Sequence, residues 1–238
     1  MKEKPIIAID GPAGAGKSTL AKDLARELGL KYIDSGAMYR AFGLKCVEKG
    51  LSADNIAGIT ELLEKTKIAI SIKGDKSSII INGEDVTGKI RTPEAGKAAS
   101  VFSAIPIVRE KMIGLQRAIG HENGVVMDGR DIGTVVFPDA DIKVFLEAGN
   151  ITRAVRRFKE LYGEDKEPDK SSAEFQKILS DQTGRDKADM NRASSPLKPA
   201  EDAVILDSTS MSKSEVLNEV IRLLNQKGIL KSRKDQFF

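Results

Sequence analysis

A glycine-rich segment near the start of the chain has the residue types and spacing of a phosphate-binding loop. It runs from Gly11 to Ser18, reads GPAGAGKS and fits the pattern G-x-x-x-x-G-K-[ST]. The apolar run Ile6 to Ile9 precedes it, and a helical pattern begins at Lys17. Backbone N–H groups in such a loop point at a chain of phosphates, and the lysine adds a mobile positive charge near the β and γ oxygens. The segment therefore predicts that the chain binds a nucleoside triphosphate.

Two side chains carry oxygen atoms suited to a magnesium ion that accompanies the triphosphate. The hydroxyl of Ser18 can reach Mg²⁺. Asp128 directly follows the apolar run Val125 to Met127, where this architecture places a metal-organising carboxylate, which we expect to act through water. The residues expected to contact ATP are Gly11, Pro12, Ala13, Gly14, Ala15, Gly16, Lys17, Ser18 and Thr19.

Three later segments combine arginine and aspartate with glycine or serine. They are Asp34 to Arg40 (DSGAMYR), Asp128 to Pro138 (DGRDIGTVVFP) and Gly184 to Arg192 (GRDKADMNR). A guanidinium group presents a planar fork that matches phosphate, and an aspartate beside it can read a base edge or a ribose hydroxyl. The third segment, taken alone, is equally typical of a solvated, salt-bridged helix. Together the three segments indicate a second phosphorylated ligand, as phosphoryl transfer between nucleotides requires.

Composition and missing motifs exclude several other classes of protein. No Asn-Lys-x-Asp or Leu-Ser-Gly-Gly-Gln string is present, which argues against a GTPase and a transporter-type ATPase. A net charge of +3 does not suggest a dedicated nucleic-acid binder. The single cysteine, Cys46, rules out an internal disulfide. No signal segment or apolar stretch of ~18 residues is visible, so we expect a cytoplasmic protein without a membrane partner.

The elements that must position these residues alternate between strands and helices. Five short apolar runs predict parallel strands at residues 6–9, 31–33, 125–127, 142–146 and 203–206. Helical patterns cover residues 17–28, 36–49, 107–121, 151–162, 174–187 and 213–224. This alternation predicts an α/β protein, a three-layer P-loop NTPase fold around a five-stranded parallel sheet. Ligands in such sheets bind beyond the carboxyl ends of the strands, so Asp10, Asp34 and Asp128 should rim the site.

One segment interrupts the alternation. Residues 66–72 and 78–83, joined by a turn at 73–76, read as an antiparallel hairpin, and Val86 opens a further short strand. We expect this insertion to sit as a small appendage on the core. The division predicted for residues 1–238 is a single domain with a core of 1–64 and 99–238, a β-rich insertion of 65–98 and a short segment at 153–170 that the family resemblance described next implies to be a lid. The tail 231–236 is charged, and we expect a frayed end there.

Over nearly its whole length the chain resembles the bacterial-type cytidylate kinases, which phosphorylate CMP and dCMP with ATP. The resemblance rests on Gly11–Ser18, Asp34–Arg40, Asn82–Thr87, Ala99–Arg109, Asp128–Pro138, Arg185–Arg192 and Asp207–Thr209. Adenylate kinases resemble the chain in the loop but carry aspartate where Ala37 stands. They also carry Asp-Gly-Phe-Pro-Arg where this chain reads Asp-Gly-Arg-Asp. Both departures point away from AMP as acceptor.

The resemblance implies a role for each polar residue around the acceptor. The cytosine would be read by Ser100, Arg109 and Asp131, the ribose would meet Tyr39, Arg185 and Asp189, and the phosphate would meet Ser35, Arg40, Arg130 and Arg192. Asp131 can accept from the N4 amine of cytosine, where uracil offers an oxygen instead.

The catalytic residues expected are Lys17, Asp128, Arg130, Arg153 and Arg157. The acceptor phosphate is already anionic, so catalysis needs positioning and electrostatics rather than a general base. Arg153, Arg156 and Arg157 lie on one helical stretch, which is also compatible with a solvated amphipathic helix. The resemblance favours lid arginines that neutralise charge on the transferring group.

Two alternatives remain open from the sequence alone. A kinase of another small acceptor, such as UMP, AMP or shikimate, would share the loop. A P-loop switch that signals to a partner would use the hairpin as its docking surface. The favoured reading is a monomer that binds ATP, Mg²⁺ and CMP or dCMP, with no nucleic-acid partner.

Overall fold

A five-stranded parallel sheet forms the centre of the molecule. The computed structural model describes residues 4–73 and 76–229, and the strand order is β2-β6-β1-β7-β8. The strands are β1 (Ile6–Asp10), β2 (Lys31–Asp34), β6 (Val125–Asp128), β7 (Ile142–Glu147) and β8 (Val204–Asp207). The apolar runs in the sequence predicted each strand to within one residue at either end. The three-layer α/β fold is thereby confirmed.

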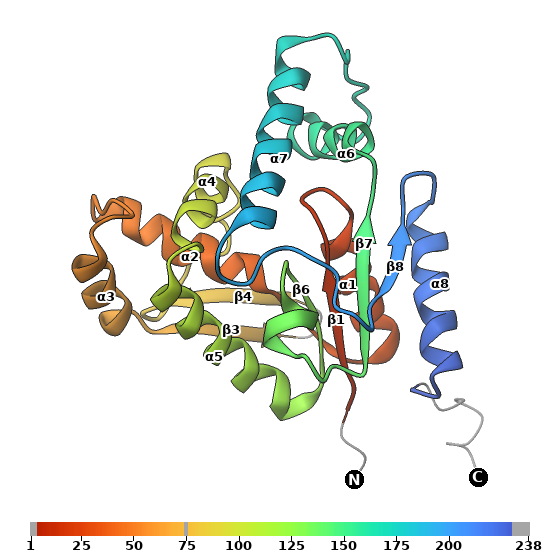
Figure 1. Ribbon diagram of the computed structural model, residues 1–238, viewed down its shortest axis with the longest axis horizontal. Coiled ribbons are helices and arrows are strands. Elements are labelled where there is room, and N and C mark those ends of the chain that lie inside the picture. Colours follow the sequence, from red (N-terminus) through yellow and green to blue (C-terminus); the bar gives the residue numbers. More distant parts are fainter. Residues whose placement is uncertain (1–3, 74–75, 230–238) are drawn as a thin grey trace.

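Helices cover both faces of this sheet (Figure 1). On one face, α1 (Lys17–Leu28) and α8 (Lys213–Gln226) pack against Ile7 and Ile9 of β1. On the other, α5 (Pro106–Asn123) and a π-helical turn, η1 (Ile132–Val136), pack around Ala8. Side chains alternate across a strand, so β1 contributes to both cores and is buried between them.

The part of the molecule predicted to lie on the acceptor side contains a small antiparallel sheet. It consists of β3 (Ile68–Lys73), β4 (Lys76–Ile81) and β5 (Glu84–Asp85), flanked by α2 (Ser35–Glu48), α3 (Ile56–Lys65) and α4 (Pro93–Phe102). Met38, Ile59, Ile79 and Phe102 belong to one continuous hydrophobic core, so the hairpin packs into the acceptor-side core rather than standing apart as the appendage we expected. The sequence patterns had also not predicted α3 or α4. Two turn residues of the hairpin, 74 and 75, and the charged tail 231–236 lie outside the described residues.

The last two helices before β8 form an arm beyond the carboxyl ends of the strands (Figure 1). They are α6 (Asn150–Tyr162) and α7 (Ala173–Asn191), held together by Ala154, Phe175 and Ile178. The helix predicted at 174–187 extends to Asn191, which places Asp189 on it. Like the other helices in the described part of the chain, these two are not long and apolar enough to cross a membrane.

Candidate active site

The loop between β1 and α1 takes a conformation that only glycine allows at three positions. Gly11, Gly14 and Gly16 have φ values of 142°, 75° and 98°. A Cβ atom on Gly11 would lie 2.1 Å from the carbonyl oxygen of Leu146 in β7. The loop is therefore pressed against the neighbouring strand, and it leads straight into the N-terminus of α1, as expected for a phosphate-binding loop.

Lys17 is buried inside this loop. Its Nζ donates to the carbonyl oxygen of Pro12 at 2.6 Å. Burial lowers its pKa to about 7, and the nearby positive charge of Arg130 acts in the same direction, against the charges of Asp128 and Asp10. The ammonium group thus stands beside an acceptor-side arginine in a poorly solvated position, where an additional anion would stabilise its charge.

The two predicted metal-site residues are in contact. The hydroxyl of Ser18 donates to Asp128 Oδ2 at 2.8 Å, and the hydroxyl of Tyr32 donates to Oδ1 at 2.9 Å. Burial, followed by repulsion from Asp34, raises the pKa of Asp128 to about 6. The donor set consists of oxygen atoms only, which suits Mg²⁺. No group of three or more His, Cys, Asp or Glu that could hold a metal occurs among the described residues. Mg²⁺ often binds through only one or two carboxylates together with substrate phosphates, so this site fits.

The strand register places the phosphate-side acceptor residues next to Asp128. Asp34 of β2 lies directly opposite Asp128 of β6. It caps α2 by accepting from Ala37 N at 2.9 Å, and its other oxygen holds Arg40 Nη2 at 2.6 Å. The hydroxyl of Ser35 donates to the main-chain oxygen of Asp128 at 2.7 Å. Ser35 and Arg40 are therefore brought to the same edge as the donor loop.

A buried ion pair forms the centre of the predicted base site. Arg109 of α5 pairs with Asp131, and both side chains are almost fully excluded from solvent. Arg109 Nη1 also donates to the main-chain oxygen of Ser103 at 3.1 Å, and the guanidinium lies 5.6 Å from the centre of the Tyr39 ring. Ser100 lies one turn earlier in α4, where its carbonyl accepts from the Ser103 hydroxyl. The structure thus brings Arg109 and Asp131 together with Tyr39 beside them, while among the described residues Ser100 is connected to this pair only through Ser103.

Several polar atoms around this pair are buried without a hydrogen-bond partner in the described chain. They are Tyr39 Oη, Arg109 Nε, Arg192 Nη2 and, from α5, Gln116 Nε2. Burial raises the pKa of Tyr39 to about 12, so its hydroxyl remains a donor at neutral pH. Buried polar groups are nearly always satisfied, so these atoms indicate the place of a polar ligand. No sequence motif pointed to Gln116, because a single buried amide on a helix gives no signal.

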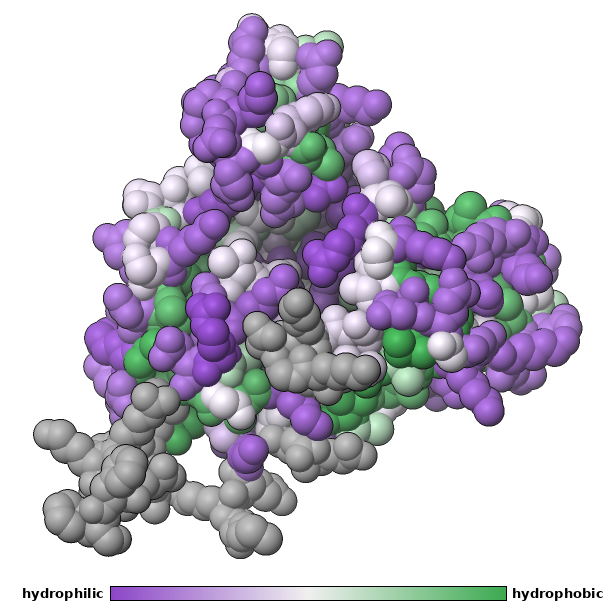
Figure 2. Space-filling view, turned by 180° about the vertical axis from the view of Figure 1, so that it is seen from behind, coloured by the Kyte–Doolittle hydropathy of each residue, from purple (hydrophilic) through white to green (hydrophobic). Residues whose placement is uncertain are grey.

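The C-terminal half of α7 supplies the remaining acceptor residues. Arg130 Nε contacts Asp189 Oδ2 at 3.0 Å, and Arg192 Nη1 lies 3.6 Å from Asp189 Oδ1. Burial is the largest single influence on the pKa of Arg130 and lowers it, but the charge and hydrogen bond of Asp189, together with the charges of Asp186 and Asp128, raise the pKa overall. A Cβ atom on Gly96 of α4 would lie 2.9 Å from Arg185 Nη2, which places this arginine between the two helices. Figure 2 shows that this face of the molecule is hollowed below the arm and that the residues around the hollow are mainly hydrophilic.

Asp10 has a different position from the one predicted. It does not rim the site: its two carboxylate oxygens accept from the main-chain N–H groups of Ile132 and Gly133 at 2.8 and 2.7 Å. Arg117 holds the far end of the same turn by donating to the carbonyls of Val135 and Val136. Asp10 thereby fixes η1, the turn that directly follows Arg130 and Asp131.

The predicted lid arginines have three different surroundings. Arg153 is buried against the phosphate loop, donating to the carbonyl oxygen of Ala13 at 2.8 Å. Arg157 is half-exposed and pairs with Glu160 at 2.9 Å. Arg156 donates to the carbonyl oxygens of Ala15 at 3.0 Å and Ser208 at 2.7 Å. Of the three, Arg157 is the one without a hydrogen bond to the phosphate loop or to Ser208 in the described part of the chain, and its partner is Glu160 of the same helix.

Comparisons with known proteins point in one direction. The sequence matches the family model described as cytidylate kinase over residues 7–226. A cytidylate kinase from Caldicellulosiruptor saccharolyticus is 46% identical over 217 residues, covering 91% of this chain and 94% of that protein. One from Pelotomaculum thermopropionicum is 45% identical over 222 residues, covering 93% and 96%. Among solved structures, a shikimate kinase from Acinetobacter baumannii in complex with shikimate covers 94% of both chains, with 16% identity and a TM-score of 0.43. A structural likeness at that level supports no functional argument.

Proposed function

The chain belongs to the cytidylate kinase family, and we propose that it transfers the γ-phosphoryl group of ATP to CMP or dCMP, giving CDP or dCDP. Relatives of 45% and 46% identity along almost the whole chain support this activity. The roles of individual residues in this reaction are also part of the proposal.

One observation carries the assignment of the site. Lys17 of the donor loop and Arg130 of the acceptor side are both held at the same sheet edge, close enough for Arg130 to lower the pKa of Lys17. Two positive charges in this poorly solvated position repel each other. A phosphoryl group between them, as it passes from ATP to CMP, would be stabilised by both. The arrangement therefore favours transfer between two phosphorylated ligands.

On the donor side, the loop from Gly11 to Thr19 holds the phosphates of ATP. Its N–H groups and the N-terminus of α1 face the β-phosphate, and Lys17 exchanges the Pro12 carbonyl for phosphate oxygens. Ser18 and Asp128, which are in contact, would hold Mg²⁺ together with the nucleotide, and we expect Asp128 to act through water. A bound Mg²⁺ ion neutralises charge on the phosphate oxygens.

On the acceptor side, each part of CMP meets a separate group of residues. Asp131 accepts from the N4 amine of cytosine, while Arg109 and Ser100 donate to O2 or N3. Asp189, Arg185 and Tyr39 lie where the ribose would sit, and the phosphate is held by Ser35, Arg40, Arg130 and Arg192.

Transfer then depends on position and charge alone. The acceptor phosphate is anionic near neutral pH, so no side chain must remove a proton before attack. Arg130 and Lys17 stabilise the in-line transfer, and closure of the arm brings Arg157 toward the same phosphates. Closure also excludes water, which limits wasteful hydrolysis of ATP. Arg153 holds the phosphate loop in position through its hydrogen bond to the carbonyl oxygen of Ala13.

The test is a coupled assay of ADP formation with ATP, Mg²⁺ and a panel of nucleoside monophosphates. Rapid ADP formation with CMP and dCMP, and slow formation with AMP and UMP, is the expected result. Slow hydrolysis at one rate regardless of the acceptor would overturn the proposal and favour a nucleotide switch. Omission of Mg²⁺ should abolish the reaction.

We propose that a monomer is the active unit. Light scattering of the purified protein, with and without both nucleotides, measures this directly. We further propose that the enzyme works in the cytoplasm, where its substrates ATP and CMP are used. Fractionation of cells, followed by immunoblotting of each fraction, tests that location.

A further inference from the structure

One buried carboxylate ties the arm to the phosphate loop. Asp186 of α7 accepts from the main-chain N–H of Ala13 through Oδ1 at 3.1 Å. Its other oxygen, Oδ2, pairs with Nη1 of Arg153 on α6. Both side chains are about 95% shielded from solvent. A carboxylate so deeply buried, paired with Arg153 and bonded to the loop, fixes three elements relative to one another.

Arg153 also binds the phosphate loop directly. Arg153 Nη1 donates to the carbonyl oxygen of Ala13 at 2.8 Å, so both polar groups of Ala13 are bound by the arm. Arg153 also donates to the carbonyl oxygen of Ala148 at 3.0 Å and to Oδ1 of Asn150 at 2.6 Å. The loop, the end of β7 and the start of α6 are therefore joined at one point.

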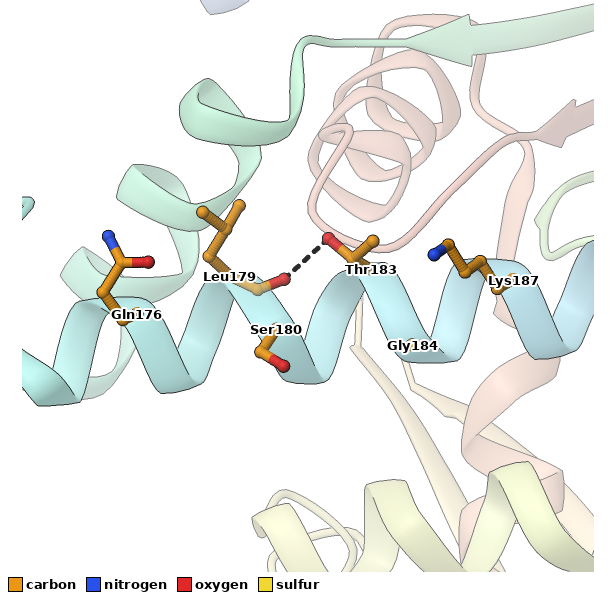
Figure 3. A pocket seen from close by; sticks show the side chains of 6 residues that line it. All are labelled: Gln176, Leu179, Ser180, Thr183, Gly184 and Lys187. Atoms are coloured by element: carbon orange, nitrogen blue, oxygen red, sulfur yellow. Dashed lines mark hydrogen bonds between the residues drawn. The ribbon is translucent and has the colours of Figure 1, made fainter.

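The contact continues along α7. Gln182, one turn before Asp186, donates to the carbonyl oxygen of Arg153 at 3.4 Å, and its amide nitrogen would lie 2.8 Å from a Cβ atom on Gly14. In the preceding turns, Leu179 is directed toward α6 while Ser180 points away from it (Figure 3). The face of α7 that carries Asp186 is thus packed against α6 and against the phosphate loop.

The residues on either side of Asp186 belong to the acceptor site. Arg185 immediately precedes it and reaches α4, and Asp189, one turn later, pairs with Arg130 at 3.0 Å. In this short stretch of α7, Asp186 therefore contacts the phosphate loop, while Arg185 and Asp189 face the acceptor site. A shift of the loop on binding triphosphate would be carried through Asp186 into the acceptor groups.

We infer that Asp186 is a positioning residue that couples the binding of ATP to the binding of CMP, an inference that rests on the proposed function. It touches neither reacting group, and it acts through Ala13 and Arg153. The loop and α7 move as one unit while this link is intact, so a ligand that orders the loop also orders Arg185 and Asp189. Linkage is reciprocal, so CMP must tighten the binding of ATP by the same factor.

The charges in the site support this role. Burial lowers the pKa of Lys17, and the charge of Asp186 is among those that oppose this shift. The same carboxylate also helps to raise the pKa of Arg130, after the larger contribution of Asp189. Asp186 therefore acts on a cation of the donor side and on a cation of the acceptor side.

The test compares the dissociation constant of CMP with and without a bound ATP analogue. Calorimetric titrations use CMP alone and CMP with Mg²⁺ and saturating β,γ-imido-ATP, which does not transfer its phosphoryl group. In the wild type, the analogue should tighten CMP binding by at least about 5-fold, the lower end of typical coupling factors. Asp186→Asn keeps the volume and one acceptor oxygen but removes the charge that holds Arg153. In this variant, the factor by which the analogue tightens CMP binding should fall toward 1.

The ratio of the two constants separates coupling from general damage, because a distorted acceptor site weakens both constants and leaves their ratio unchanged. Asp181→Asn, an exposed aspartate on the same helix, is the matched control and should keep the wild-type factor. If Asp186→Asn does not fold, as judged by circular dichroism, Arg153→Lys replaces it. Lysine keeps the charge but cannot reach Ala13, Ala148 and Asp186 together, so the factor should again fall toward 1.

Two results would overturn the inference: a wild-type factor of 1, or an unchanged factor in the folded variant. A failure of the proposed function looks different, because CMP would then bind neither with nor without the analogue.

Discussion

Each arginine that we assign to CMP, apart from Arg185, has an aspartate partner within the chain. Arg40 is held by Asp34, Arg109 by Asp131 and Arg130 by Asp189. A guanidinium group buried as deeply as that of Arg109 would cost several kcal/mol without a partner, so Asp131 stabilises it in place. Binding CMP must therefore exchange or share existing partners. For this reason, truncation of one member of a pair affects folding as well as recognition.

Asp131→Asn should reduce base selectivity while preserving the fold. The amide can no longer accept with full charge from the N4 amine of cytosine, and its NH₂ group can donate to the O4 of uracil. A change of about 1–3 kcal/mol corresponds to a fall of about 5- to 150-fold in the CMP-to-UMP ratio of kcat/KM. Asn is preferable to Ala because, although both remove the negative charge, the amide oxygen of Asn can still accept a hydrogen bond from the buried Arg109.

The control for this variant is Asp139→Asn, an exposed aspartate in the same segment of chain. It should keep the wild-type ratio. A wild-type ratio in Asp131→Asn itself would show that the cytosine edge is read elsewhere.

Lys17→Ala should slow transfer to every acceptor equally. In the proposed mechanism its ammonium acts on the phosphates of ATP and does not touch the base, so kcat should fall by at least about 100-fold for CMP and dCMP alike. Steady-state kinetics with both acceptors measure this, and Lys111→Ala, an exposed lysine on α5, serves as control. A loss confined to one acceptor would place Lys17 in acceptor recognition instead.

At the scale of elements, the sequence predicted what apolar periodicity and strand ends reveal. The five strands and α1 were predicted almost residue for residue, and the motifs met at one edge because parallel strands end together. By contrast, α4 buries Ala95 and Ala98, small residues that leave little hydrophobic periodicity. The turn η1 depends on bonds to Asp10, 122 residues away along the chain. Such long-range bonds, like that of Asp186 to Ala13, leave no local pattern.

The close packing of α2 on α4 gives a prediction about how the acceptor side is held. A Cβ atom on Gly43 of α2 would lie 2.8 Å from the carbonyl carbon of Ala98, so alanine at position 43 must push the helices apart. Gly43→Ala should lower the free energy of unfolding by about 1–3 kcal/mol. Ser100 sits on α4, so the KM for CMP should rise while the KM for ATP changes little.

Gly114→Ala tests the same substitution where space is open. Gly114 lies on the exposed side of α5, and nothing lies within 4 Å of a Cβ atom there. Alanine in a helix interior is favoured over glycine by roughly 0.5–1 kcal/mol, so this variant should be more stable than the wild type. Urea denaturation measures the free energy of unfolding of both variants, and steady-state kinetics give their KM values for CMP and ATP. Equal effects at the two positions would contradict the packing argument.

At the scale of the whole molecule, the sheet edge holds ionisable groups that the fold keeps out of water. Asp10, Lys17 and Asp128 are all buried where β1 and β6 end. For each of them burial is the largest cause of a shifted pKa, which moves toward neutrality from both sides. Such groups lower the stability of the fold at pH values where they are charged. Keeping Lys17 and Asp128 of the candidate site buried, with Asp10 next to them, therefore costs free energy of folding.

Asp10 allows this cost to be measured, because its partners are main-chain N–H groups. Burial raises its pKa from 3.8 to about 6 in the folded protein. Between these values the folded state binds more protons than the unfolded state, so the free energy of unfolding falls as the pH rises. The stabilising contribution is complete below 3.8 and is lost as the pH passes about 6. A shift of about 2 pKa units corresponds to roughly 3 kcal/mol.

Asp10→Asn removes this titration while keeping a carbonyl oxygen that can accept from Ile132 or Gly133. The free energy of unfolding of the wild type, minus that of the variant, should therefore fall by up to about 3 kcal/mol between about pH 4 and pH 7. Above about pH 7 the two curves should run parallel, because Asp10 is then ionised in both states of the wild type. Urea denaturation across this range measures the difference. Curves that stay parallel from about pH 4 upward would mean that Asp10 is ionised throughout and that η1 is held by a full negative charge.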